Sequence, residues 1–275
     1  GLTPGVTSLI NLAPAFHCIY AFRLVDGSEQ RPARWFHLCF AIVAGLTLFR
    51  VYIWSERLAM IEMAVPFGLA AGRWMATSRL PAVGALRLLG PYAALPFVIL
   101  YFGVAEYYRS WTSGTYNGKM DFWDFAIGRF ASYYYTALNN AAGFAATQPR
   151  PLFEFEFILE WAHKAPFGVG KIFSEFVGFQ GPRWEWYLES YQDPEFNSPS
   201  ALFTVVADLG LMGALAYMLL VGLVSGMIFR MYRQGRLAGV LVFPLFFISF
   251  LELFRYPYLG QPRARALRDD LDAAR

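Results

Sequence analysis

Six long apolar stretches constrain what this chain can fold into. They cover roughly 4–22, 35–54, 57–74, 83–105, 200–229 and 237–259. A helix needs about 20 apolar residues to cross the hydrocarbon core of a bilayer, because its backbone must satisfy its own hydrogen bonds there. The third stretch is the weakest, since Glu62 and Pro66 interrupt it. The sequence therefore predicts an all-α protein, a polytopic transmembrane helix bundle of about six spans.

The composition is typical of a membrane protein, and it gives no support for nucleic-acid, metal or nucleotide binding. The chain is 57% hydrophobic and 16% charged, against about 45–50% and 25% in soluble domains. A net charge of +3 gives no reason to expect a nucleic-acid partner. Neither the two cysteines nor the three histidines show metal-ligand spacing, and no nucleotide-binding motif occurs. We therefore expect no metal and no cofactor.

Basic residues predict the orientation of the spans, since arginines gather on the cytoplasmic side. Three clusters fall on one side by alternation: Arg23, Arg31 and Arg34; Arg73, Arg79 and Arg87; Arg230, Arg233 and Arg236. The long loop 107–199 then lies outside, and its ten acidic and seven basic residues show no positive bias. The predicted organisation is four spans in 1–106, the external loop 107–199, two spans in 200–259 and a charged tail, 260–275.

The tail departs from this pattern. It carries four arginines, yet the span count places it outside together with the N-terminus. Either a further span is missing, or 237–259 is a re-entrant or broken segment. An external basic tail and an external N-terminus are both expected if the chain is part of a longer protein.

The external loop is too aromatic to be disordered. Residues 121–147 predict a helix that starts near Asp121 and that Gly143 can end. Residues 151–164 begin with Pro151 at a plausible first helical position, although their alternating Phe and Glu equally suit a short strand. We expect a cap of short helices on the outer membrane surface. Its aromatic rings would anchor at the headgroups or stack on sugars.

Four arginines are predicted to face one external compartment: Arg50, Arg57, Arg129 and Arg255. Their forked donors suit a diphosphate. The alternative is that each reaches the headgroups or pairs with a carboxylate, for which Glu62 and Glu252 are candidates. Asp208, within a span, either accepts a hydrogen bond from a neighbouring helix or lies beneath a site and closes it on the side away from the external face. Gly210 and Gly213 are expected to permit close helix packing.

Several short motifs occur in a set order: SERLAMIEMAVP, RFASYYYTALNN, EFNSPSALFTVVADLGLMGAL and LFRYPYL. In this order they resemble the C-terminal two-thirds of the O-antigen (Wzy-like) oligosaccharide repeat-unit polymerases, over most of 35–259. The resemblance implies a GT-C-like glycosyltransferase of the bacterial inner membrane. Such enzymes join repeat units carried on undecaprenyl diphosphate, with membrane lipids and a chain-length regulator as further partners.

The resemblance also implies roles for individual residues. Arg50, Arg57, Arg129 and Arg255 would stabilise the diphosphate leaving group. Glu56, Glu195 and Asp208 are candidate general bases. The predicted substrate-binding residues are Tyr133, Tyr134, Asn139, Asn140, Arg183 and Asn197. A histidine that precedes the fifth span in the related ligases is absent, and Glu195 and Asn197 occupy that region.

Three other functions remain open. An O-antigen ligase would move finished glycan to a different acceptor. A polysaccharide or lipid transporter would need polar residues along a path between both faces, often with an internal repeat, and no repeat is visible here. A structural membrane subunit would leave the arginines replaceable.

Overall fold

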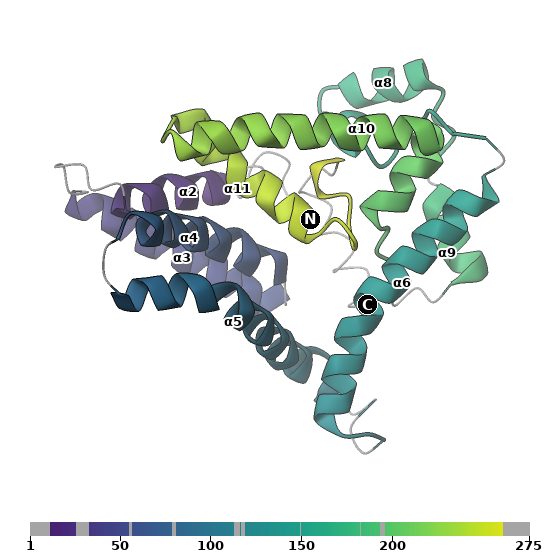
Figure 1. Cartoon of the computed structure of the whole chain (residues 1–275). Helices are drawn as coiled ribbons and strands as arrows, with labels where there is room; N and C mark the ends of the chain where they lie inside the picture. The colour runs from purple at the N-terminus through teal and green to yellow at the C-terminus, as the bar shows by residue number, and fades with distance from the viewer. Residues whose placement is uncertain are drawn as a thin grey trace. The chain divides into compact units, whose positions relative to one another are not determined.

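The structure, a computed structural model, describes residues 12–25, 33–54, 57–78, 81–112, 116, 119–148, 150–181, 183–192 and 196–260. Every regular element of these residues is a helix, as predicted (Figure 1). The predicted bases Glu56 and Glu195, the start of the first span and the tail beyond Gly260 lie outside the described residues.

Each of the six apolar stretches contains a helix in its described part. The helices are α2 (Leu12–Val25), α3 (Arg34–Trp54), α4 (Arg57–Thr77), α5 (Pro81–Glu106), α10 (Ala201–Arg233) and α11 (Leu237–Leu251). The last is shorter than predicted. Its 15 residues extend about 22 Å at a rise of about 1.5 Å each, whereas a hydrocarbon core is about 30 Å thick. Residues 252–260 are turns and a short 3₁₀ helix, η3 (Tyr258–Gly260), in agreement with the alternative of a broken segment.

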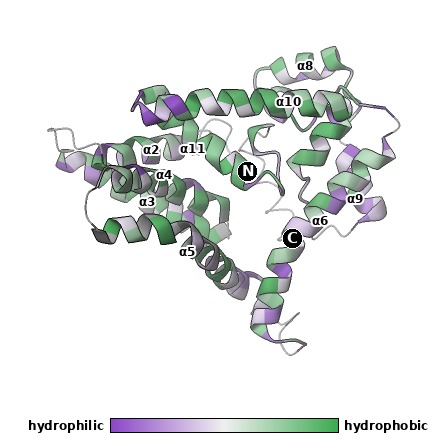
Figure 2. Ribbon diagram, in the orientation of Figure 1, coloured by the Kyte–Doolittle hydropathy of each residue, from purple (hydrophilic) through white to green (hydrophobic). Residues whose placement is uncertain are grey.

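Among the described residues, two helices are long and apolar enough to cross a membrane: Arg34–Ile53 within α3, and α10. Apolar residues run along most of α10 (Figure 2). In each helix only 11% of the most apolar window is buried. A helix in the core of a soluble protein would bury most of that surface, so these two helices suit apolar surroundings.

The chain divides into two compact units. The first contains residues 1–130 and 228–247, and the second contains residues 131–227 and 248–275. In the first unit α2 packs against α3 and α4. There the ring of Tyr20 stacks on Phe40 at 4.0 Å. Arg73 Nη1 donates to the carbonyl oxygen of Tyr232 at 2.8 Å, so α4 holds the last turn of α10.

The predicted loop 107–199 contains a π-helical turn, η1 (Tyr107–Trp111), and helices α6 (Phe122–Thr147), α7 (Glu160–His163), α8 (Val169–Val177) and α9 (Arg183–Tyr191). The carboxylate of Asp121 accepts the N–H of Trp123 at 2.9 Å, so the predicted start of α6 is confirmed. The predicted end at Gly143 is wrong, because the helix continues to Thr147. Gly143 instead gives room to the Tyr187 hydroxyl, which a Cβ atom would strike.

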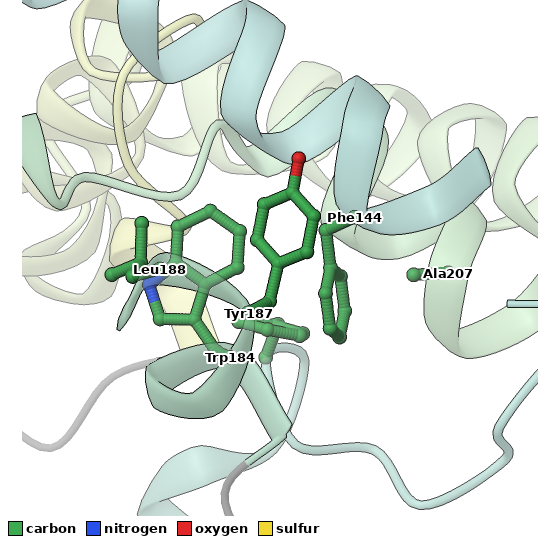
Figure 3. Packing of buried hydrophobic residues seen from close by; sticks show 6 residues of the cluster. Phe144, Trp184, Tyr187, Leu188 and Ala207 are labelled. Carbon is green, nitrogen blue, oxygen red and sulfur yellow. The ribbon is translucent and has the colours of Figure 1, made fainter. Parts of the chain in front are cut away.

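An aromatic core holds the second unit together. Phe144 of α6, Phe157 and the α9 residues Trp184, Tyr187 and Leu188 are buried against Ala207 of α10. Figure 3 shows the Tyr187 ring between Trp184 and Phe144. The ring centroids of Phe144 and Trp184 are 5.4 Å apart at 83°, an edge-to-face contact. The core therefore fixes the loop helices against the first turns of α10.

The segment 151–159 is neither the helix nor the strand that the sequence predicts. Phe153 and Phe155 have φ of 53° and 57°, in the left-handed region. Leu152 and Phe153 donate their backbone N–H groups to the carbonyls of Ala207 and Asp208, at 3.0 and 2.9 Å. The segment is therefore shaped by its bonds to α10 and not by its own helical or strand propensity.

Those carbonyls are available because α10 breaks at Gly210, where φ is 69° and ψ is 172°. In a continuous helix, residues 211 and 212 would donate to them. A Cβ atom at position 210 would lie 2.8 Å from Pro151 Cγ. Gly210 thus interrupts a helix, a role different from the close helix packing that the sequence suggested.

Candidate functional site

Three segments that are distant in sequence meet in the second unit. The N–H of Ser200 donates to the carbonyl of Ala137 in α6 at 3.4 Å, and the N–H of Ala201 donates to the carbonyl of Leu253 at 3.2 Å. The start of α10 is thus bonded both to α6 and to the turn after α11. This framework brings several predicted site residues together.

Arg255 is the arginine best placed to bind an anion. Its guanidinium lies over the Tyr133 ring, 5.5 Å from the centroid, and Nη1 bonds the Glu252 carboxylate at 3.1 Å. The predicted pairing of Glu252 with an arginine is therefore confirmed. The Arg255 side chain is 34% exposed, against 7% for Glu252. Its Nε is buried and has no hydrogen-bond partner among the described residues. A positively charged side chain that is held in place and partly exposed suits a phosphate group.

Tyr134 adds a hydroxyl to this place. Burial first, and then the nearby Glu252 carboxylate, raise the pKa of Tyr134 above its ordinary value of 10.0, while Arg255 lowers it. The Tyr134 hydroxyl is protonated at neutral pH even at its ordinary pKa, and the raised pKa extends this state to more alkaline solution, so the hydroxyl can donate a hydrogen bond. Tyr133, Tyr134, Glu252 and Arg255 are called the Arg255 site below.

The predicted amide residues lie on the same framework with different exposure. Asn140 is buried and donates from Nδ2 to the carbonyl of Phe196 at 2.8 Å. The Phe196 ring meets Tyr133 edge-on at 5.5 Å. Asn140 therefore positions the segment behind Tyr133. Asn139 and Asn197 are exposed, and the Asn197 carbonyl accepts from Trp184 Nε1 at 3.2 Å.

A cavity of about 40 Å³ lies beside the turn that carries Arg255. Leu253, Tyr256 and Tyr258 line it from that turn, and Val205 and Met218 line it from α10. Its walls are almost wholly apolar. Arg255 is not among its lining residues, and ligand pockets of proteins measure about 300–1,000 Å³, so the cavity belongs to the packing behind the turn that carries Arg255.

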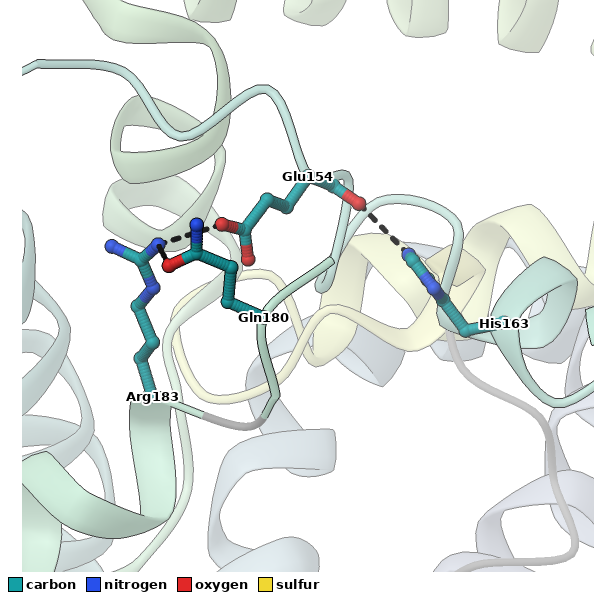
Figure 4. A network of polar contacts seen from close by, with 4 residues as sticks. All are labelled: Glu154, His163, Gln180 and Arg183. Atoms are coloured by element: carbon teal, nitrogen blue, oxygen red, sulfur yellow. Dashed lines mark hydrogen bonds and ion pairs between the residues drawn. The ribbon is translucent and has the colours of Figure 1, made fainter. Parts of the chain in front are cut away.

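A second polar network surrounds Glu154 (Figure 4). Arg183 Nη2 lies 2.7 Å from the Glu154 carboxylate and 3.2 Å from Gln180 Oε1. His163 Nε2 donates to the carbonyl of Glu154 at 2.8 Å, since that oxygen only accepts. Arg183, predicted to bind substrate, thus pairs with a buried carboxylate as Arg255 does, and its side chain is 35% exposed.

Asp208 lies at the break in α10 and is fully buried. Its Oδ2 accepts the N–H of Phe157 at 3.2 Å, and its backbone carbonyl accepts that of Phe153. Asp208 therefore accepts a hydrogen bond, as one interpretation of the sequence predicts, but the donor lies in the irregular segment 151–159 and not on a neighbouring helix. Its role as general base stays a prediction.

Glu156 is a buried carboxyl group that sequence reasoning did not single out. Burial, and then the carboxylates of Glu185, Asp208, Glu154 and Glu160, raise its pKa to about 8. The only signal in the sequence is the alternation of Phe and Glu in 153–157, which suits a short strand as well as a helix. Among the described residues, no group of three or more acidic, His or Cys side chains is arranged to hold a metal ion.

The other predicted arginines belong to the first unit. Arg129 is buried, and its Nε lies 2.7 Å from Glu106 Oε2. It also packs over the rings of Tyr116 and Phe125. Arg50 is half-buried in α3, and Arg57 is the first residue of α4. Arg255 belongs to the second unit, so the shared compartment of the four stays a prediction.

Comparison of the chain with protein-family models, with curated proteins and with solved structures found no match. The resemblance to the repeat-unit polymerases therefore stays a prediction from the motifs. The chemistry of the Arg255 site is the best guide to function.

Proposed function

We propose that this protein is a multi-pass membrane glycosyltransferase that polymerises oligosaccharide repeat units linked to undecaprenyl diphosphate. In this proposal α2 to α5, α10 and α11 form the membrane part, in the bacterial inner membrane. The Arg255 site would bind the diphosphate from the external side. The observation that carries the proposal is the Arg255 guanidinium, which Tyr133 and Glu252 hold in place while part of it remains exposed.

The lipid-linked donor has a diphosphate head and an apolar tail. Arg255 offers positive charge to the head, and the exposed apolar surface of the membrane helices would face the tail. Tyr133 and Tyr134 add an aromatic face and a protonated hydroxyl, which suit sugar rings.

The reaction would be a single displacement. A hydroxyl of the acceptor sugar attacks the anomeric carbon of the donor, the bond from that carbon to the diphosphate oxygen breaks, and a carboxylate takes the hydroxyl proton. Negative charge grows on the leaving diphosphate, and a prepositioned guanidinium stabilises it without reorganisation. The general base stays a choice among Glu56, Glu195 and Asp208.

Loss of the gene in the bacterium that carries it tests this proposal. Electrophoresis of the surface glycan should show single repeat units on their final acceptor and no ladder. Polymer that accumulates on the lipid carrier would indicate a ligase instead. An unchanged ladder would contradict both enzymes.

A further inference from the structure

Helix α8 has an apolar face that protein does not cover in the described residues. Val169, Ile172 and Phe176 lie on one side at helical spacing, and Lys171 and Glu175 lie on the other. The residue before the helix, Phe167, is 100% exposed; Phe176 is 86% and Ile172 is 69% exposed. Soluble surfaces rarely leave such large side chains bare and adjacent, so this face has a binding role.

The opposite edge of α8 is held firmly. The Phe173 ring packs against the His163 ring at 4.8 Å, and Ser174 Oγ lies 2.9 Å from His163 Nδ1. Gly170 donates to the carbonyl of Ala165 at 3.2 Å, and a Cβ atom there would strike the carbonyl of His163. These contacts therefore hold α8 in place and fix the direction in which its exposed face points.

These contacts tie α8 to α10. The segment before α7 packs through Ile158 on Val205 and Ala214, with Leu159 beside them. The segment 151–159, which leads into α7, thus sits against the N-terminal part of α10, and α7 in turn packs on α8. Figure 1 shows α8 above the same end of α10. In this part α10 itself exposes Leu211, Met212 and Leu215.

We propose that α8 and Phe167 insert into the bilayer leaflet that surrounds the N-terminal part of α10. The apolar surface of α8 continues that of a helix able to cross a membrane. On the polar face of α8, the side chains of Lys171 and Glu175 form an ion pair of 3.8 Å. Their charges cancel, so this face carries no net charge that the headgroups would repel. An exposed Trp161 in α7 adds the ring type that collects at membrane interfaces. The proposal depends on α10 crossing the membrane and is independent of the glycosyltransferase activity.

Spin labels on the full chain test the insertion. Cys18→Ala and Cys39→Ser remove the native thiols, and single cysteines at 172 and 176 then carry a nitroxide on the apolar face. Labels at 171 and 175 are the matched controls on the polar face. The chain is placed in vesicles of phosphatidylethanolamine and phosphatidylglycerol, and the accessibility of each label to oxygen and to a neutral nickel chelate is measured.

If α8 inserts, labels 172 and 176 should be more accessible to oxygen than to the nickel chelate. Labels 171 and 175 should be more accessible to the nickel chelate than to oxygen. Nickel access at all four positions would overturn the proposal, because the face would then be in water. Labels at 172 and 176 that reach neither reagent would also overturn it, since protein would then cover the face. Circular dichroism of each labelled variant checks that it is folded.

Discussion

Arg129 and Glu106 form an ion pair of 2.7 Å in which both side chains are buried. Removing one partner leaves the other charge without compensation in a medium that solvates it poorly, which costs about 3–5 kcal/mol. Arg129→Ala should therefore lower the melting temperature of the purified protein and its level in the membrane. Its loss of activity would then not report on catalysis.

The double variant Arg129→Met with Glu106→Leu separates the two roles. It removes both charges together, so it should recover most of the lost stability. Arg109→Ala, an exposed arginine in η1, is the control and should change the melting temperature little. A stable Arg129→Ala variant without activity would contradict the structural role and favour the leaving-group role.

Gly210 should tolerate no side chain. Gly210→Ala puts a Cβ atom at a φ of 69° and 2.8 Å from Pro151, so the break in α10 and the segment 151–159 must both shift. Strain of this kind costs roughly 1–3 kcal/mol. Gly222→Ala, in the same helix with open space around it, is the matched control. Thermal melting and limited proteolysis of the loop should separate the two; equal behaviour would contradict the break.

Glu156 should make stability depend on pH. Its pKa is about 8 in the folded protein against an ordinary 4.5. The folded state then holds a proton that the unfolded state has lost, so stability falls as pH rises between these values, by up to about 1.4 kcal/mol per unit. The contribution is complete below pH 4.5 and lost above about 8. Glu156→Gln should flatten the melting temperature over this window, whereas the exposed Glu175→Gln should not. An unchanged slope in Glu156→Gln would contradict the assignment.

The apolar pattern predicted the long helices well because their hydrophobicity is a local property of the sequence. Bounds such as Arg34–Trp54 follow the predicted 35–54 closely. The segment 151–159 was predicted wrongly because its conformation comes from bonds to carbonyls of α10, which lie some fifty residues away. The break in α10 that frees these carbonyls depends on the φ of a single glycine. The periodicity of apolar residues gives no sign of such a break.

Within the candidate site, the sequence predicted residue types better than partners. Glu252 and Arg255 are three positions apart in the sequence, so their ion pair could be predicted from the spacing. The ion pair of Arg129 joins two separate helices, α6 and α5, and nothing in the spacing indicates Glu106. Glu156 shows no motif at all, since its unusual environment is created by carboxylates from several segments.

The most direct measurement of the central claim is glycan synthesis by the purified full-length protein on a synthetic undecaprenyl-diphosphate repeat unit. The wild type should extend the unit into a ladder. Arg255→Lys keeps the charge but loses the planar fork that packs on Tyr133, so its rate should fall at least about tenfold, and Arg255→Ala should give no product. Arg255→Lys keeps a positive charge beside the buried Glu252 carboxylate and should melt near the wild-type temperature. Arg255→Ala leaves that carboxylate without its partner and should melt lower, so its activity is measured at a temperature where it is folded. A folded Arg255→Ala variant that builds the full ladder would contradict the account.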